Sequence, residues 1–150
     1  TILQYSQIGA IIILFLIFIF INVKNTLPKL GDVNIKSREY REVGIWLREQ
    51  TPEHSKIALI EVGIIGWYSN RYIIDMLGLV SPHNGRLIGL RKFDGWLNYY
   101  SPDYIIAHDP LWGPESGILS ALEKKLFVEV KEFNFKGLKA YKKHAPKKIL

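Results

Sequence analysis

The stretch KIALIEVGIIGWYSNRYIID, residues 56–75, has the pattern of two buried strands joined by a short helix. Residues 57–60 are continuously apolar, as in a strand that is buried on both faces. A turn and a short helix over residues 63–68 precede a second apolar strand, which ends on Asp75. Because strands that alternate with helices build α/β proteins, this stretch predicts the fold class of the domain around it.

The segments around this stretch extend the same pattern. Residues 38–50 carry apolar side chains on one helical face, and Pro52 ends that helix. Further along, we expect a third strand, a helix and a hairpin of two strands at residues 101–109, 113–127 and 127–144. We therefore predict an α/β fold with a small, mostly parallel sheet, helices on both faces and a C-terminal antiparallel hairpin whose strands lie at the sheet edge.

An uncharged apolar run, residues 8–23, precedes the domain. Together with the uncharged residues before it, the run reaches about 23 residues, and a membrane-spanning helix needs about 20. Neither a basic start nor a small-residue cleavage site marks it as a signal peptide. We predict a transmembrane helix over residues 1–24, a linker over residues 25–37 that contains Pro28 and Gly31, and a soluble α/β domain over residues 38–150.

The composition restricts the classes of function. The net charge of +6 favours anionic partners such as phosphates and acidic lipid headgroups, and a solvated basic surface without a partner is the alternative. The chain contains no cysteine, which excludes disulfides, thiolate catalysis and cysteine-ligated zinc. The lysines that follow the apolar run would place the domain in the cytoplasm, but long domains cross membranes regardless of such charges.

Polar side chains follow each of the three predicted parallel strands: Glu61, Asp75, His108 and Asp109. The carboxyl ends of parallel strands meet at one edge of a sheet, where ligands of open α/β proteins bind. Asp75 has two interpretations at this edge. It either belongs to a ligand-contacting cluster with Tyr68, Arg71 and His83, or it caps the turn that follows its strand.

Other motifs argue against several enzyme classes. Gly63 and Gly66 form only part of a dinucleotide-binding turn, and a phosphate-binding P-loop is absent. The four histidines lack the spacing of a helical metal site, and no Gly-x-Ser-x-Gly elbow accompanies them. A group of aromatic residues suits either stacking on sugar rings or burial in a core or at a membrane interface: Trp67, Tyr68, Trp96, Tyr99, Tyr100 and Trp112.

The order of short motifs along residues 38–107 points to a known group of enzymes. The motifs are Trp46-Leu47 before Thr51-Pro52, the strand at residues 57–62, Gly66-x-Tyr68-Ser69, Ile74-Asp75-x-x-Gly78-Leu79, and Ser101-Pro102-Asp103-Tyr104-Ile105. This order, after a membrane-spanning segment, resembles the C-terminal soluble part of polytopic glycosyltransferases with the GT-C architecture. That group includes polyprenyl- and dolichyl-phosphate sugar mannosyltransferase-like and arabinosyltransferase-like membrane enzymes.

The resemblance implies a polyprenyl-phosphate-linked sugar donor and transfer at the outer face of the membrane. The catalytic acids of that family lie in loops between earlier transmembrane helices, so we expect a non-catalytic, extracytoplasmic accessory domain here. No cofactor is expected in this chain, and a divalent metal would belong to the upstream transmembrane part. The expected partners are membrane lipid, those upstream helices and a glycan or lipid-linked acceptor, but no nucleic acid. The candidate acceptor-binding residues are Trp67, Tyr68, Arg71, Asp75 and His83.

Two other hypotheses remain open. The chain fits a binding or scaffold domain anchored by a single helix, without enzymatic activity. It also fits a nucleotide- or phosphate-binding α/β domain on the cytoplasmic face, in line with its positive charge.

Overall fold

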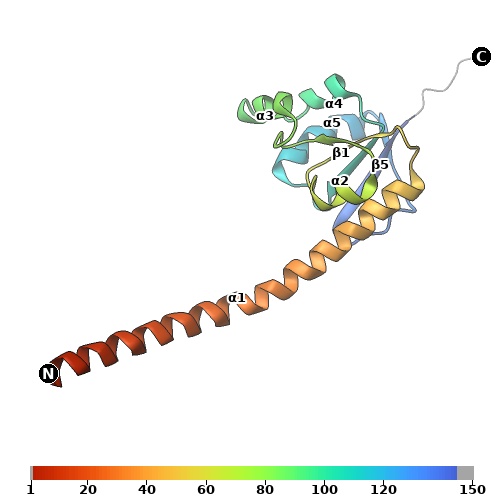
Figure 1. Cartoon of the computed structure of the whole chain (residues 1–150). Helices are drawn as coiled ribbons and strands as arrows, with labels where there is room; N and C mark the ends of the chain where they lie inside the picture. The colour runs from red at the N-terminus through yellow and green to blue at the C-terminus, as the bar shows by residue number, and fades with distance from the viewer. Residues whose placement is uncertain (1, 145–150) are drawn as a thin grey trace, which may run out of the picture. The chain divides into compact units, whose positions relative to one another are not determined.

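A computed structural model describes the backbone of residues 2–144, together with the side chains of this range outside residues 2–7, 10 and 29–34. The chain forms two compact units, Thr1–Arg38 and Glu39–Leu150 (Figure 1). Helix α1, Ile2–Gln50, begins in the first unit and ends in the second. The second unit contains the sheet and, among the described residues, the helices that follow α1.

The first unit contains a stretch of α1, Ile11–Pro28, that is long and apolar enough to cross a membrane. None of this stretch is buried inside the structure, unlike the core helix of a soluble protein. The predicted linker, residues 25–37, is helical, because α1 continues through Pro28 without a break. A break would leave the backbone groups of two additional helix ends without partners, which offsets the cost of one internal proline.

The second unit is built on a five-stranded mixed sheet with the strand order β2-β1-β3-β5-β4. Strand β1 pairs in parallel with β2 and β3, whereas β5 pairs antiparallel with β3 and β4. The strands are β1 Lys56–Leu59, β2 Tyr72–Asp75, β3 Tyr104–His108, β4 Phe127–Glu129 and β5 Leu138–Lys143.

The expected C-terminal antiparallel hairpin is confirmed, but the expectation of a mostly parallel sheet is wrong. Two of the four strand pairings are parallel and two are antiparallel. The difference arises because β5 lies inside the sheet next to β3, so only β4 of the hairpin is an edge strand. A hydrophobic core lies on each face of the sheet, and β5 contributes to both, with Ala140 in one core and Tyr141 in the other.

Helices cover both faces of this sheet, as expected. The helices after α1 are α2 Ile64–Ser69, α3 Pro82–Gly89, α4 Gly95–Tyr100, the 3₁₀ helix η1 Gly113–Ile118 and α5 Leu119–Glu123. Alternate residues of each strand point to opposite faces. On one face, Ile57 and Leu59 pack with Val43 and Leu47 of α1. On the other face, Ala58 belongs to a core with residues from α4, η1 and α5: Trp96, Ile118 and Ala121.

The parallel pairings bring three strand ends to one edge of the sheet. Leu59 lies opposite Asp75 in β2, and Ala58 lies opposite Ile105 in β3. Continuing the second register by three residues places Glu61 next to His108. The polar residues at the ends of β1 and β3 are therefore neighbours.

Candidate site at the carboxyl ends of the parallel strands

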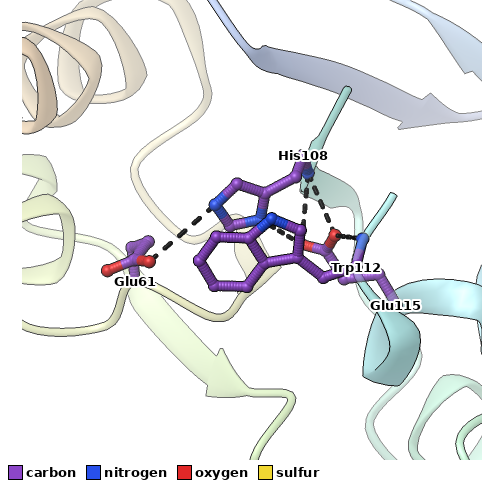
Figure 2. A network of polar contacts seen from close by, with 4 residues as sticks. All are labelled: Glu61, His108, Trp112 and Glu115. Atoms are coloured by element: carbon purple, nitrogen blue, oxygen red, sulfur yellow. Dashed lines mark hydrogen bonds and ion pairs between the residues drawn. The ribbon is translucent and has the colours of Figure 1, made fainter. Parts of the chain in front are cut away.

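His108, the last residue of β3, is the centre of a polar cluster at this edge (Figure 2). Its side chain is 10% exposed. The Nδ1 atom lies 2.8 Å from Oε1 of Glu115, and the Nε2 atom lies 3.8 Å from Oε1 of Glu61. The imidazole is thus held between two carboxylates, one of which is fully buried while the other is 29% exposed.

Glu115 is positioned by the first turn of η1 and by three donors that converge on its carboxylate. It accepts hydrogen bonds from the backbone N–H of His108 at 3.1 and 3.2 Å and from the backbone N–H of Trp112 at 2.8 Å. The bond to Trp112 is the return half of a capping box, in which an N3 glutamate binds the backbone N–H of the N-cap residue. Since a carboxylate only accepts, the third donor is the Nδ1–H of His108.

With the proton on Nδ1, the other ring nitrogen, Nε2, is buried and lacks a hydrogen-bond partner among the described residues. In a neutral imidazole, Nε2 would present a lone pair toward the carboxylate of Glu61, so two acceptors would face each other without a hydrogen between them. The arrangement is satisfied either by a proton on Nε2 or by a donor group from outside the chain.

Trp112 covers the imidazole. The two rings are stacked with their centroids 3.5 Å apart and their planes 9° apart. The Trp112 side chain remains 48% exposed even though one face of the indole lies on His108. Figure 2 shows the indole beside the imidazole, on the loop that leads from β3 into η1.

Tyr40, on the part of α1 that belongs to the second unit, completes the cluster. Its hydroxyl is close enough to Glu61 to be affected by the charge of that carboxylate. Burial, and then the proximity of the Glu61 carboxylate, raise the pKa of Tyr40 above its ordinary value.

Asp75 has the capping role that was one of its two interpretations. Its side chain is fully buried, and its carboxylate accepts hydrogen bonds from the backbone N–H groups of Leu77 at 2.9 Å and Val80 at 2.6 Å. The side-chain amide of Asn84 donates to the Asp75 carbonyl at 2.6 Å. The acid at the end of β2 thus stabilises the turn that connects β2 to α3.

Arg71 stabilises the end of α1. Its guanidinium donates to the Thr51 carbonyl at 2.8 Å, to the Thr51 hydroxyl at 3.1 Å and to the carbonyl of Arg48. Because Arg71 precedes β2 and Asp75 ends it, the four-residue strand separates them by roughly 13 Å. The two residues therefore do not share a site.

The other three candidate acceptor-binding residues lie apart as well. Trp67 on α2 is 82% exposed, and Tyr68 lies under the guanidinium of Arg41 at 5.2 Å. His83 on α3 stacks on Tyr99 of α4, with centroids 3.8 Å apart. The structure does not gather the five candidates into one site.

Sequence reasoning found part of the cluster and missed the rest. Glu61 and His108 were expected at this edge from the strand ends. Glu115 was missed because its sequence context predicts only an acid in the first turn of a helix. The loop that turns η1 back toward β3 is what buries it, and the tryptophan at the N-cap gives no capping-box signal, since that motif needs serine or threonine there.

A cavity of about 650 Å³ lies elsewhere, between α4, α5 and the ends of β4 and β5. Its lining includes Ser101, before β3, and Lys143, at the end of β5, so it opens at the opposite edge of the sheet. Lys124 and Lys125 at its rim follow the last turn of α5, where cations offset the exposed helix carbonyls. Among the residues with described side chains, no group of three or more histidines and acids is arranged to hold a metal ion.

These features define a mixed α/β domain that follows a helix able to span a membrane and that carries a carboxylate–imidazole–carboxylate cluster at its carboxyl edge. The chain belongs to the family described as "Domain of unknown function (DUF8728)", whose profile matches residues 33–146. Comparison with curated proteins and with solved structures finds no match.

Proposed function

We propose that this chain is a C-terminal, extracytoplasmic accessory domain of a polytopic membrane glycosyltransferase that uses a polyprenyl-phosphate-linked sugar donor. The observation that carries the proposal is the continuity of α1. The same helix contains the apolar stretch Ile11–Pro28 and, in the second unit, Val43 and Leu47, which pack against the sheet. A domain that works beside a membrane-embedded active site needs such a tether.

The motif order along residues 38–107 supports the glycosyltransferase class. The chemistry of transfer would belong to the upstream transmembrane part, including any divalent metal. In this proposal the domain holds or orients a polar glycan or a lipid-linked acceptor.

Sugar transfer by the full-length protein tests this proposal. The protein encoded by the complete gene would be purified in detergent and incubated with polyprenyl-phosphate-linked mannose or arabinose and a membrane glycan fraction. We expect transfer by the full-length protein, none by the 150-residue chain alone, and a marked loss when residues 51–150 are deleted. A full-length protein that transfers neither sugar would refute the glycosyltransferase assignment.

The side of the membrane can be tested separately because the chain contains no cysteine. A single Lys124→Cys substitution places a thiol on an exposed position in α5's C-terminal turn. In a full-length protein freed of other cysteines, labelling by a membrane-impermeant maleimide in intact cells is expected for an extracytoplasmic domain. Labelling only after the cells are lysed would place the domain in the cytoplasm.

The second candidate is a binding or scaffold domain anchored by a single helix, without enzymatic activity. Among the described residues, one helix is long and apolar enough to cross a membrane, which is all that such an anchor requires. A complete gene that encodes one apolar span, with a product that resists carbonate extraction from membranes, would favour this candidate. Several upstream spans would favour the glycosyltransferase.

A further inference from the structure

We propose that Trp112, Glu61 and His108 form a carbohydrate-binding site at the carboxyl edge of the sheet. This inference rests on the proposed function and deepens it, because it assigns the glycan contact to residues other than the five sequence candidates. The ligand class is a neutral sugar with neighbouring hydroxyl groups. Three properties of the cluster carry the assignment: an aromatic platform, a buried imidazole nitrogen beside a carboxylate, and the absence of a lysine or arginine partner among the described residues.

The platform is the indole of Trp112. One face of the ring is covered by the His108 imidazole at a centroid distance of 3.5 Å, yet the side chain is 48% exposed. The exposed area therefore lies on the other face and the ring edges. Large aromatic faces combine apolar area with a polar handle, which suits the apolar C–H face of a sugar ring. Because Glu115 binds the Trp112 backbone N–H, the backbone beneath the platform is held in place.

The imidazole nitrogen and the carboxylate lie beside this platform. Nε2 of His108 and Oε1 of Glu61 are 3.8 Å apart, and no donor from the described residues reaches Nε2. With His108 neutral, a buried Nε2 without a donor costs about 1–3 kcal/mol, and a sugar hydroxyl supplies that donor while a neighbouring hydroxyl donates to Glu61. With a proton on Nε2, the imidazolium donates to a sugar hydroxyl oxygen instead. Glu61 is 29% exposed, so its carboxylate is open to a ligand at this edge of the sheet.

The charge of the cluster selects against anionic ligands. Glu61 and Glu115 both carry carboxylates, and within the described part of the chain neither forms an ion pair with a lysine or arginine. Phosphate groups are bound in proteins by arginine, lysine or helix N-termini. The cluster therefore fits the sugar rather than the phosphate portion of a lipid-linked glycan.

Binding to the complete chain in detergent micelles tests the site. Soluble oligosaccharides of mannose, arabinose, glucose and galactose would be titrated by calorimetry. We expect at least one of them to bind, and we expect Glu61→Gln and Trp112→Ala each to weaken it by about tenfold or more. The matched controls are Glu132→Gln, an exposed acid on the β4–β5 loop, and Tyr72→Ala, an exposed aromatic on β2. Both controls should retain the affinity within about twofold.

Thermal unfolding of each variant separates lost binding from lost structure. Glu61→Gln changes a partly exposed side chain, so this variant should fold. It therefore still tests the site if the Trp112→Ala variant fails to fold. No binding by any oligosaccharide, or binding that survives both Glu61→Gln and Trp112→Ala, would overturn the proposal. Loss of binding in Trp67→Ala alone would instead assign the ligand to α2.

The two proposals fail in different ways. Sugar binding by the chain together with an inactive full-length protein would retain this site and refute the glycosyltransferase assignment. Sugar transfer by the full-length protein without any binding by the chain would refute this site alone.

Discussion

The indole of Trp112 lies flat on the imidazole of His108, with ring centroids 3.5 Å apart. Four residues of chain separate β3 from η1, and the reversal between them brings the His108 ring and the Trp112 backbone N–H to the Glu115 carboxylate. A single buried acid thereby links the end of a central strand, the following loop and the first turn of the next helix. The stability of the site and that of the fold are coupled through Glu115.

We expect Glu115→Gln to destabilise the second unit by about 2–3 kcal/mol, because the amide NH₂ would face donors where the carboxylate accepted three hydrogen bonds. Urea denaturation of the wild type and the variant measures this difference. Glu123→Gln, an exposed acid on α5, is the matched control and should change stability by less than about 0.5 kcal/mol. Equal effects of the two substitutions would contradict the role given to Glu115.

Asp75→Asn should also act on stability, because the carboxylate caps a buried turn. The amide retains only one oxygen for the backbone N–H groups of Leu77 and Val80, and we expect a loss of about 1–3 kcal/mol. Asp94→Asn is the control, since the exposed Asp94 makes no capping hydrogen bond with its side chain. Unchanged unfolding midpoints in Asp75→Asn would show that the turn does not depend on this cap.

Arg71→Ala removes the side chain that satisfies the last carbonyls of α1. We expect a loss of about 2 kcal/mol, since hydrogen bonds from a charged donor are stronger than neutral ones. Hydrogen exchange should show faster opening of residues 47–51 than in the wild type. Arg86→Ala, on the exposed side of α3, should leave both measurements unchanged; a similar effect there would indicate a general response to lost positive charge.

The raised pKa of Tyr40 predicts a loss of stability in alkaline solution. A tyrosine whose folded pKa lies above the unfolded value of 10 contributes stability that is fully present below pH 10. That contribution disappears as the pH rises through the folded pKa. Tyr40→Phe should therefore lose less stability than the wild type when unfolding is compared at neutral pH and above pH 10.

Glu61→Gln is the informative companion to Tyr40→Phe. It removes the negative charge that adds to burial in raising the pKa of Tyr40, so the pKa should fall toward its ordinary value while some elevation from burial remains. Tyrosinate absorbance during an alkaline titration measures the change. Identical titrations for the wild type and Glu61→Gln would mean that the two side chains do not interact in solution.

Much of the strand pattern was predictable from local sequence. The apolar run after Lys56 and the apolar residues before Asp75 are the parallel strands β1 and β2, and the alternation after Phe127 precedes the turn into β5. These predictions succeed because side-chain periodicity reports the local environment of each strand. The pairing partners of the strands could not be predicted in this way. The pairing of β5 with β3 joins segments about thirty residues apart, and side-chain periodicity carries no information on such distant partners.

The sequence by itself determined the apolar span, the mixture of helices and strands, and the placement of Glu61 and His108 at strand ends, because these depend on composition and local periodicity. Only the tertiary structure decided that α1 continues through Pro28, that Arg71 and Asp75 bind backbone groups, and that Glu115 and Trp112 contact His108. The reason is physical: burial and hydrogen-bond partners are properties of contacts between distant segments, and a polar residue gains its role only when the fold supplies its neighbours.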